Sequence, residues 1–250
     1  MYTQIKHSLN GRKTDIAIKS LNTLNLPNAL LIIPDGNGRW AKSLGKSIYE
    51  GHKQGAAVFA KILDHFLKIN IKVLGAWGFS EDNWRRPVSE IDNIMDVIEN
   101  IVKKNTQKII DNDIKFLVIG KKNRVESQYP TLFKILQDSM DKTSKNNGKI
   151  LALFIDYGEK YQLEEFAKAR GKNPNTNTYT LLSEINQGLP LFDMVLRTSG
   201  EQRMSGFGPL ASLAEFVSIE KNLPDLTDND IAGALIEYST RQRRFGGRVV

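Results

Sequence analysis

The sequence contains no cysteine. This absence removes thiol nucleophiles, cysteine-ligated zinc and disulfide bonds from the candidate chemistry, and it gives no sign of an oxidising compartment. The chain also lacks an uninterrupted apolar run of the ~18 residues that a membrane-spanning helix needs. Residues 1–20 are interrupted by Lys, His and Arg, so they lack the apolar core of a signal peptide. We therefore expect a cytoplasmic protein.

The length and composition suit one large domain. A chain of 250 residues lies at the size where a single hydrophobic core stops growing, about 250–300 residues. Its hydrophobic fraction of 40% is ordinary for a globular protein. Residues 1–28 are polar and irregular, so we expect an N-terminal extension over 1–28 and a single domain over 29–250.

The net charge indicates an anionic partner. The formal charge is +7 and the pI is about 9.4. Nucleic acid, a membrane surface or a polyphosphate substrate would each satisfy that charge, and charge alone does not choose among them.

The hydrophobic pattern predicts an α/β fold. Short apolar runs typical of buried strands occur at 29–34, 71–79, 114–120, 149–158 and 192–200. Segments with apolar residues at helical spacing lie between or after them, at 51–70, 91–112, 129–143 and 227–238. Such alternation predicts a mostly parallel sheet flanked by helices on both faces. The polar stretch 171–180 is predicted to be a surface connection.

The first predicted strand leads into Asp35-Gly36-Asn37-Gly38-Arg39-Trp40. Ligands of open parallel sheets bind beyond the carboxyl ends of the strands, so these residues are candidates for a site. The glycines let backbone N–H groups converge on an anion, Arg39 adds a guanidinium, and Asp35 supplies an oxygen ligand for a hard cation. The segment indicates a metal–diphosphate site, although it is neither a Walker loop nor a dinucleotide fingerprint.

Two further strand ends are rich in groups that bind anions. Residues 79–87, FSEDNWRRP, follow the second strand, and the segment after the last main strand holds Arg197, Arg203 and Ser205. Arginine offers planar, multidentate donors to phosphate oxygens, so these three residues predict a second diphosphate site.

Five segments together resemble the cis-prenyltransferase (undecaprenyl diphosphate synthase) family. They are IIPDGNGRWAKSLGKSIYEGHKQG, FSEDNWRRP, VLRTSGEQRMS, LAEF and EYSTRQRRFGG, in the family's order between Leu31 and Gly247. The resemblance implies a catalytic domain over 29–250 with a central parallel sheet and a hydrophobic tunnel for the prenyl chain. It further implies a homodimer, Mg²⁺ as cofactor, an allylic prenyl diphosphate and isopentenyl diphosphate as substrates, and contact with a membrane surface through the product.

The resemblance also assigns roles to individual residues. Asp35 is implied to be catalytic and to engage Mg²⁺, with Glu215 as a second metal-linked carboxylate. The residues implied to hold the allylic diphosphate are Gly36, Asn37, Gly38, Arg39, Trp40 and His52. The isopentenyl diphosphate site is implied to be Arg197, Arg203 and Ser205. The loop that closes over the substrates corresponds to Ser80, Asp82, Asn83, Trp84 and Arg86, with Asn83 implied to aid proton removal. Tail arginines and Gly246-Gly247 are implied to reach the neighbouring subunit's diphosphate.

Several positions depart from the family pattern, mostly on the allylic side. Pro34 replaces the usual Met, Ile48 replaces an Arg that binds the allylic diphosphate, and Asp82 replaces Glu. The usual Asn-Tyr-Gly-Gly-Arg reads Asp-Tyr-Gly-Glu-Lys at 156–160, and the segment between Ser205 and Glu215 is one residue short and has lost its Trp.

Three interpretations therefore stay open. The first is condensation of an allylic diphosphate with isopentenyl diphosphate to form a new cis double bond. The second, within the same class, is an irregular coupling or a cyclisation, as in lavandulyl-type members. The third is a non-catalytic partner subunit, which the retained Asp35 disfavours. Nucleic-acid binding is not expected, because the basic residues lie in the diphosphate motifs.

Overall fold

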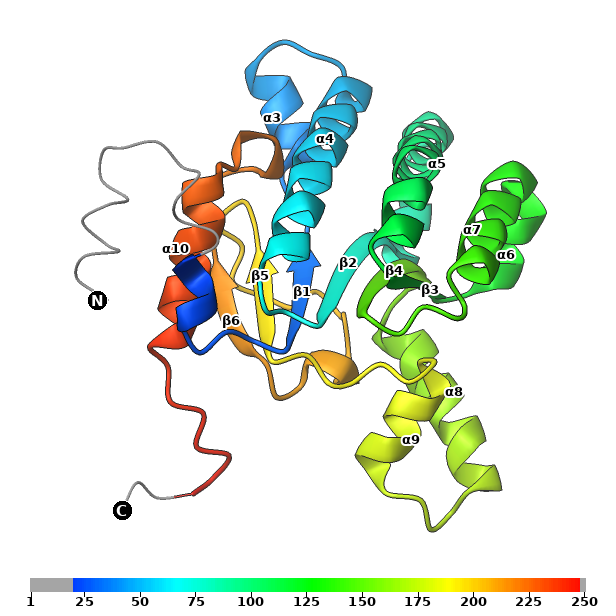
Figure 1. Cartoon of the computed structure of the whole chain (residues 1–250). Coiled ribbons are helices and arrows are strands. Elements are labelled where there is room, and N and C mark those ends of the chain that lie inside the picture. Colours follow the sequence, from blue (N-terminus) through cyan, green and yellow to red (C-terminus); the bar gives the residue numbers. More distant parts are fainter. Residues whose placement is uncertain (1–19, 248–250) are drawn as a thin grey trace.

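The computed structural model describes residues 20–247, which form a six-stranded, fully parallel sheet (Figure 1). The strand order is β3-β4-β2-β1-β5-β6. The strands are β1 (Ala29–Ile33), β2 (Val73–Ser80), β3 (Ile114–Ile119), β4 (Lys149–Tyr157), β5 (Met194–Arg197) and β6 (Glu215–Ser218). The predicted parallel sheet is confirmed, and five of its strands lie where the apolar runs placed them. The sequence pattern missed β6, which has only one buried side chain among its four residues and therefore no apolar run.

Eight α-helices accompany the strands in the described residues (Figure 1). They are α3 (Asn37–Ser43), α4 (Ile48–Lys68), α5 (Val88–Asp111), α6 (Lys122–Gln128), α7 (Pro130–Lys142), α8 (Glu159–Lys172), α9 (Thr178–Ile185) and α10 (Asp228–Ser239). The 3₁₀ turns are η2 (Leu21–Thr23), η3 (Glu81–Arg85), η4 (Pro209–Ala211) and η5 (Leu223–Asp225). The predicted connection at 171–180 shrinks to the five residues between α8 and α9. The predicted extension over 1–28 lies mostly outside the described residues.

Helices α4, α5 and α7 pack on one face of the sheet (Figure 1). Helix α4 begins at a capping box, in which the Ser47 side chain accepts from the Glu50 N–H and the Glu50 carboxylate accepts from the Ser47 N–H. Its buried residues recur at helical spacing and are Gly51, Gly55, Val58, Ile62, Leu63 and Phe66. These residues pack into the larger of two core clusters, which also contains the buried face of α5.

The sequence predicted helices on both faces of the sheet, but the second face is covered mainly by other segments. Its core consists of strand residues together with side chains from the segments before and after β5, among them Phe192, Phe207 and, in η4, Leu210. Phe207 packs edge-on against Trp77 and Phe154, with ring centroids 5.3 and 4.9 Å away. Because large aromatic side chains bury much area from short segments, this face needs no continuous helical layer.

The carboxyl ends of β1, β2 and β5 meet at one edge of the sheet, where α3, η3 and the segment 198–206 begin. Ile33 of β1 is paired with Arg197 of β5, so the residues that follow both strands are neighbours. This register brings the first and third predicted anion-binding segments together. Among residues 20–247, no helix has the length and apolar character to cross a membrane.

Candidate active site

Asp35 lies at the centre of the polar site. Its Oδ1 accepts from Arg39 Nη2 at 3.0 Å and from the Gly36 N–H at 2.6 Å, and its Oδ2 accepts from Arg197 Nη2 at 2.9 Å. Burial alone would raise the pKa of Asp35, but the hydrogen bonds from Arg197 and Arg39 lower that pKa below its usual value. The carboxyl group is therefore ionised at neutral pH, as a ligand for a cation must be.

The backbone around Asp35 is held by neighbouring loops. The Asp35 N–H donates to Thr198 Oγ1 at 2.7 Å, and the Leu223 N–H donates to the Asp35 carbonyl at 3.0 Å. Gly36 has a φ of +92° and is the N-cap of α3, so the segment that follows the first strand begins a helix. A Cβ atom on Gly36 would lie 2.2 Å from Asn222 Oδ1, so only glycine fits there.

Arg197 connects Asp35 to the second predicted diphosphate site. It is 4% exposed, and its Nη1 donates to Ser205 Oγ at 2.8 Å and to the carbonyl of Arg203. The predicted trio of Arg197, Arg203 and Ser205 is thus brought together beside Asp35. The Arg203 side chain, however, points to an acid that sequence reasoning did not single out.

That acid is Glu201. Arg39 Nη1 donates to its Oε1 at 2.8 Å, and Arg203 Nη1 donates to its Oε2. Burial would raise the pKa of Glu201, but the hydrogen bonds from Arg39 and Arg203 lower it. The signal available in the sequence was its place within the segment 197–205, between two arginines already assigned to the site.

His52 and Asn37 lie where the polar pocket meets an apolar cavity. His52 Nε2 and Asn37 Oδ1 are buried and have no hydrogen-bond partner among the described residues. Burial, and secondarily the charge of Arg86, lower the pKa of His52 to about 4, so this histidine is neutral at physiological pH. Two buried polar atoms without partners are costly, so a ligand that satisfies them would bind favourably.

The segment after β2 forms the far wall of the polar pocket. Ser80 and Asn83 make a capping box, in which Ser80 Oγ accepts from the Asn83 N–H and Asn83 Oδ1 accepts from the Ser80 N–H. Arg86 donates to Glu90 at 2.9 Å, and Asp82 pairs with Arg85 at 3.3 Å. The polar pocket has a volume of about 460 Å³ and is lined by Asp35, Gly36, Asn37, Gly38, Arg39, His52, Ser80, Asp82, Asn83, Arg86, Arg197 and Ser205, among others.

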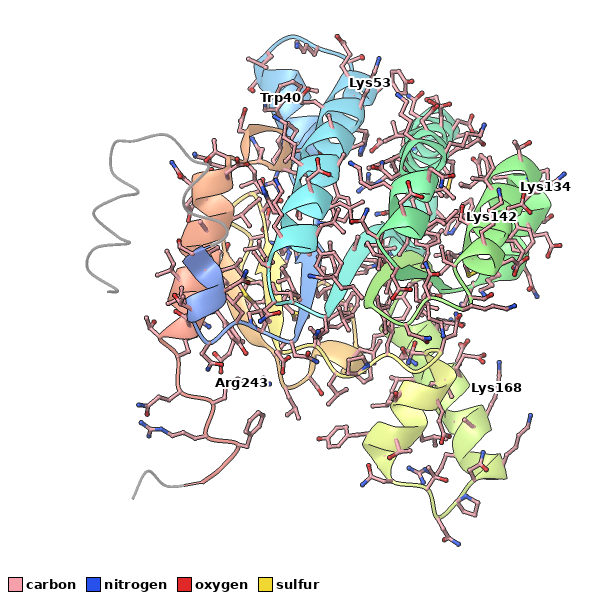
Figure 2. The ribbon with its side chains drawn as sticks, in the orientation of Figure 1. Trp40, Lys53, Lys134, Lys142, Lys168 and Arg243 are labelled. Atoms are coloured by element: carbon pink, nitrogen blue, oxygen red, sulfur yellow. The ribbon has the colours of Figure 1, made fainter. Side chains whose placement is uncertain are left out.

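Four predicted site residues do not line the polar pocket, namely Trp40, Trp84, Arg203 and Glu215. Trp84 packs edge-on against Phe79 in the core, and Arg124 stacks on its ring. Trp40 lies on α3 at the carboxyl edge (Figure 2), where its Nε1 donates to Asp225 at 2.7 Å. Neither tryptophan lines the polar pocket, so both support the site from outside it.

Within one chain, Glu215 and Asp35 lie at opposite ends of the strands. It starts β6, opposite Met194, at the amino end of the strands, whereas Asp35 lies beyond their carboxyl ends. Its carboxylate accepts from Arg241 at 3.0 Å. The tail arginines gather at this amino end as well, with Arg243 paired to Asp193 (Figure 2). A metal shared by Asp35 and Glu215 therefore has no support within the single chain.

The donors present suit a magnesium ion held mainly by substrate. No group of three or more His, Cys, Asp or Glu side chains that could hold a metal occurs among residues 20–247. Mg²⁺ commonly binds through one or two carboxylates together with substrate phosphates. Asp35 supplies one such carboxylate, and the surrounding arginines suit the phosphates.

An apolar cavity adjoins the polar pocket. It lies between α4, α5 and the sheet, has a volume of about 130 Å³, and shares Pro34, Asn37, His52, Gly78 and Ile94 with the pocket. Farther in, its walls are apolar side chains such as Phe59, Leu63, Ile98 and Phe116. An anionic head and a hydrocarbon tail can therefore bind side by side in this chain.

This chain is similar in sequence to known proteins. The family model for undecaprenyl diphosphate synthase matches residues 33–246. The curated isoprenyl transferase of Fusobacterium nucleatum is 33% identical over 228 residues, covering 89% of this chain and 97% of that protein. That of Oceanobacillus iheyensis is 32% identical over 234 residues, covering 89% and 91%.

A solved structure of a related enzyme has a similar fold. The crystal structure of lavandulyl diphosphate synthase from Lavandula x intermedia, in complex with dimethylallyl diphosphate, superposes with a TM-score of 0.80 at 27% identity. The match covers 91% of this chain and 99% of that one. By sequence and by fold, this chain belongs to the undecaprenyl diphosphate synthase family and is a prenyltransferase.

Proposed function

We propose that this enzyme joins an allylic prenyl diphosphate to isopentenyl diphosphate and forms a new cis double bond. The observation that carries the proposal is the junction at His52 and Asn37, where the polar pocket around Asp35 opens into the apolar cavity. A prenyl diphosphate has this division into a charged head and an apolar tail.

The residues divide the work between binding and charge stabilisation. Arg39, His52 and the first-turn N–H groups of α3 would hold the allylic diphosphate, while Arg203 and Ser205 would hold the second one. As the allylic C–O bond breaks, the cationic groups stabilise the departing diphosphate. The alkene of isopentenyl diphosphate attacks the allylic cation, and loss of a proton restores a double bond. The apolar walls exclude water, which would otherwise convert the cation to an alcohol.

Mg²⁺ is part of this proposal. When bound with the substrate at Asp35, it would supply a Lewis acid that neutralises charge on the leaving diphosphate. Asp35, held ionised by Arg39 and Arg197, would position the ion. The homodimer implied by the family resemblance and a catalytic domain over 29–250 also belong to the proposal.

One observation favours a second candidate, an irregular coupling of short substrates. An apolar cavity of about 150 Å³ accommodates a molecule the size of benzene, so about 130 Å³ suits one five-carbon unit. The lavandulyl diphosphate synthase to which the chain is similar was solved with dimethylallyl diphosphate. This alternative would use the same pocket with dimethylallyl diphosphate in both roles.

Product analysis separates the two candidates. The enzyme is incubated with dimethylallyl, geranyl or farnesyl diphosphate, each with and without isopentenyl diphosphate, and products are identified by mass spectrometry. Products that require isopentenyl diphosphate support the first candidate, whereas a coupled product from dimethylallyl diphosphate alone supports the second.

The Asp35→Asn variant tests the assigned role of the central acid. It removes a charge without changing side-chain volume, so we expect turnover to fall by more than about a hundredfold with the fold intact. Activity should also disappear with EDTA and return with Mg²⁺. A variant with more than about a tenth of wild-type turnover, a barrier change below ~1.4 kcal/mol, contradicts the role.

A further inference from the structure

Glu201 joins two arginines that the proposed function assigns to different substrates. Arg39 donates to its Oε1 and Arg203 to its Oε2, so each carboxylate oxygen serves one arginine. The Glu201 side chain is 17% exposed, whereas those of Arg39 and Arg203 are 53% and 63% exposed. Glu201 is thus the most buried of these three side chains, and the two more exposed arginines contact it from the solvent side.

The same guanidinium donors that hold Glu201 would have to serve the diphosphates. Arginine binds carboxylate and phosphate through the same planar set of N–H groups, so the two anions compete for them. Arg197 is different, because it is buried against Asp35, Ser205 and the carbonyl of Arg203. In the proposed reaction, Glu201 itself has no bond to make or break.

We propose that Glu201 is a positioning residue that couples the two diphosphate sites, since the first diphosphate to bind displaces its carboxylate from both arginines. This inference rests on the proposed two-substrate function. The second diphosphate then finds its arginine free. The coupling is positive, and by linkage each substrate strengthens the other by the same factor.

Charge gives the direction of the coupling. A diphosphate on Arg39 removes one of the two partners of Glu201 and places several negative charges beside the remaining carboxylate. Like charges repel strongly in a partly enclosed site, so the carboxylate turns away from Arg203 as well. The displacement is a rotation of the Glu201 side chain alone, because the loop backbone is held in place by the N–H groups of Ser199 and Gly200, which donate to the carbonyls of Lys221 and Ile219 at 2.7 and 2.9 Å.

Calorimetric binding tests this coupling without turnover. The dissociation constant of isopentenyl diphosphate is measured with and without a saturating, non-reactive allylic thiodiphosphate, at one fixed magnesium concentration. For the wild type we expect affinity to rise on the order of tenfold. For Glu201→Gln, isopentenyl diphosphate alone should already bind more tightly than it does to the wild type. The added thiodiphosphate should then change its affinity by less than about threefold.

Glu220→Gln is the matched control. Its carboxylate lies beside Gly200, next to Glu201 in the chain, and no ion pair to it occurs among residues 20–247. The Glu220→Gln substitution removes the same charge from the same region. In this variant the thiodiphosphate should still raise the affinity for isopentenyl diphosphate as it does in the wild type. Equal enhancement in wild type and Glu201→Gln, or none in the wild type, overturns the coupling and leaves the proposed function intact. If isopentenyl diphosphate binds to none of the three proteins, the proposed function fails and the inference with it.

Discussion

His52 shows how a single buried side chain can link pH to stability. Its pKa is about 4 in the folded protein, against about 6.5 when unfolded. Below pH 6.5 the unfolded chain takes up a proton that the folded chain refuses, so stability falls as the pH falls toward 4. Between pH 7 and pH 5 this amounts to a loss of up to about 2 kcal/mol.

The His52→Gln variant should lack that part of the pH dependence. Urea unfolding at pH 7 and pH 5 measures the free energy of unfolding for both proteins. We expect the loss on acidification to be smaller in the variant by up to about 2 kcal/mol. An equal loss in the two proteins would mean that His52 titrates normally.

Ile48 is the departure most directly placed to affect the allylic site. It is 44% exposed at the first residue of α4, and His52 lies one turn later on the same helix face. Ile48→Arg should therefore bring a guanidinium near the allylic diphosphate and tighten its binding by up to about tenfold. Affinity for the allylic thiodiphosphate measures the gain, with Gln54→Arg as a control that adds the same charge to another face of α4. Unchanged affinity in a folded Ile48→Arg protein would show that this position does not tune the site.

At the scale of elements, α3 and α4 make contact through a helix face without side chains. A Cβ on Gly55 would lie 2.1 Å from Asn37 Oδ1, and one on Gly51 would lie 2.2 Å from the Asn37 carbonyl. The start of α3 therefore rests on the bare backbone of α4. This close approach places Asn37 at the junction of pocket and cavity.

Gly55→Ala tests the importance of that contact. Alanine usually stabilises a helix interior, but here its methyl group must displace Asn37, so we expect a loss of about 1–3 kcal/mol. Turnover should fall more than tenfold. Gly233→Ala in α10 is the control, because a Cβ there meets nothing within 4 Å, and it should stabilise the protein by about 0.5–1 kcal/mol. Stabilisation of similar size in both variants would contradict the role of Gly55.

The elements were predictable to the extent that each carries its own pattern. The apolar runs and the helical spacing of apolar residues predicted strands β1 to β5 and helices α4, α5, α7 and α10. Helix α3 was not predicted, because its Asn-Gly-Arg start resembles a turn and only the packing of Gly36 against Asn222 fixes it. The motifs assigned Asp35 to one diphosphate site and Arg197 and Ser205 to another, and the pairing of β1 with β5 brings these three residues together. The Glu201 bridge and the inward turn of Trp84 depend on side-chain contacts between segments far apart in sequence, which no local pattern encodes.

At the scale of the whole molecule, the proposed function places the prenyl tail in the cavity between the α4–α5 layer and the sheet, where the free space would limit its length. Ala60 lines the cavity, whereas Ala57 is exposed and lines only the outer groove between the two helices. Ala60→Leu should fill part of the cavity and shift products toward shorter chains, at a cost of about 1–3 kcal/mol in stability. Product mass spectra of Ala60→Leu, Ala57→Leu and wild type measure the shift. If both leucine variants give wild-type products, the prenyl tail lies elsewhere.

The pairing of Arg241 with β6 has a consequence for self-association. The N–H groups of Glu215 and Ile219 donate toward β5, so the carbonyl of the intervening Phe216 faces the open edge of the sheet. Arg241 donates to that carbonyl at 3.0 Å. A free strand edge is a template for adding further strands, and a bound arginine blocks it with a charge that an incoming strand would have to bury. Arg241 therefore disfavours the edge-to-edge association of this sheet with another one.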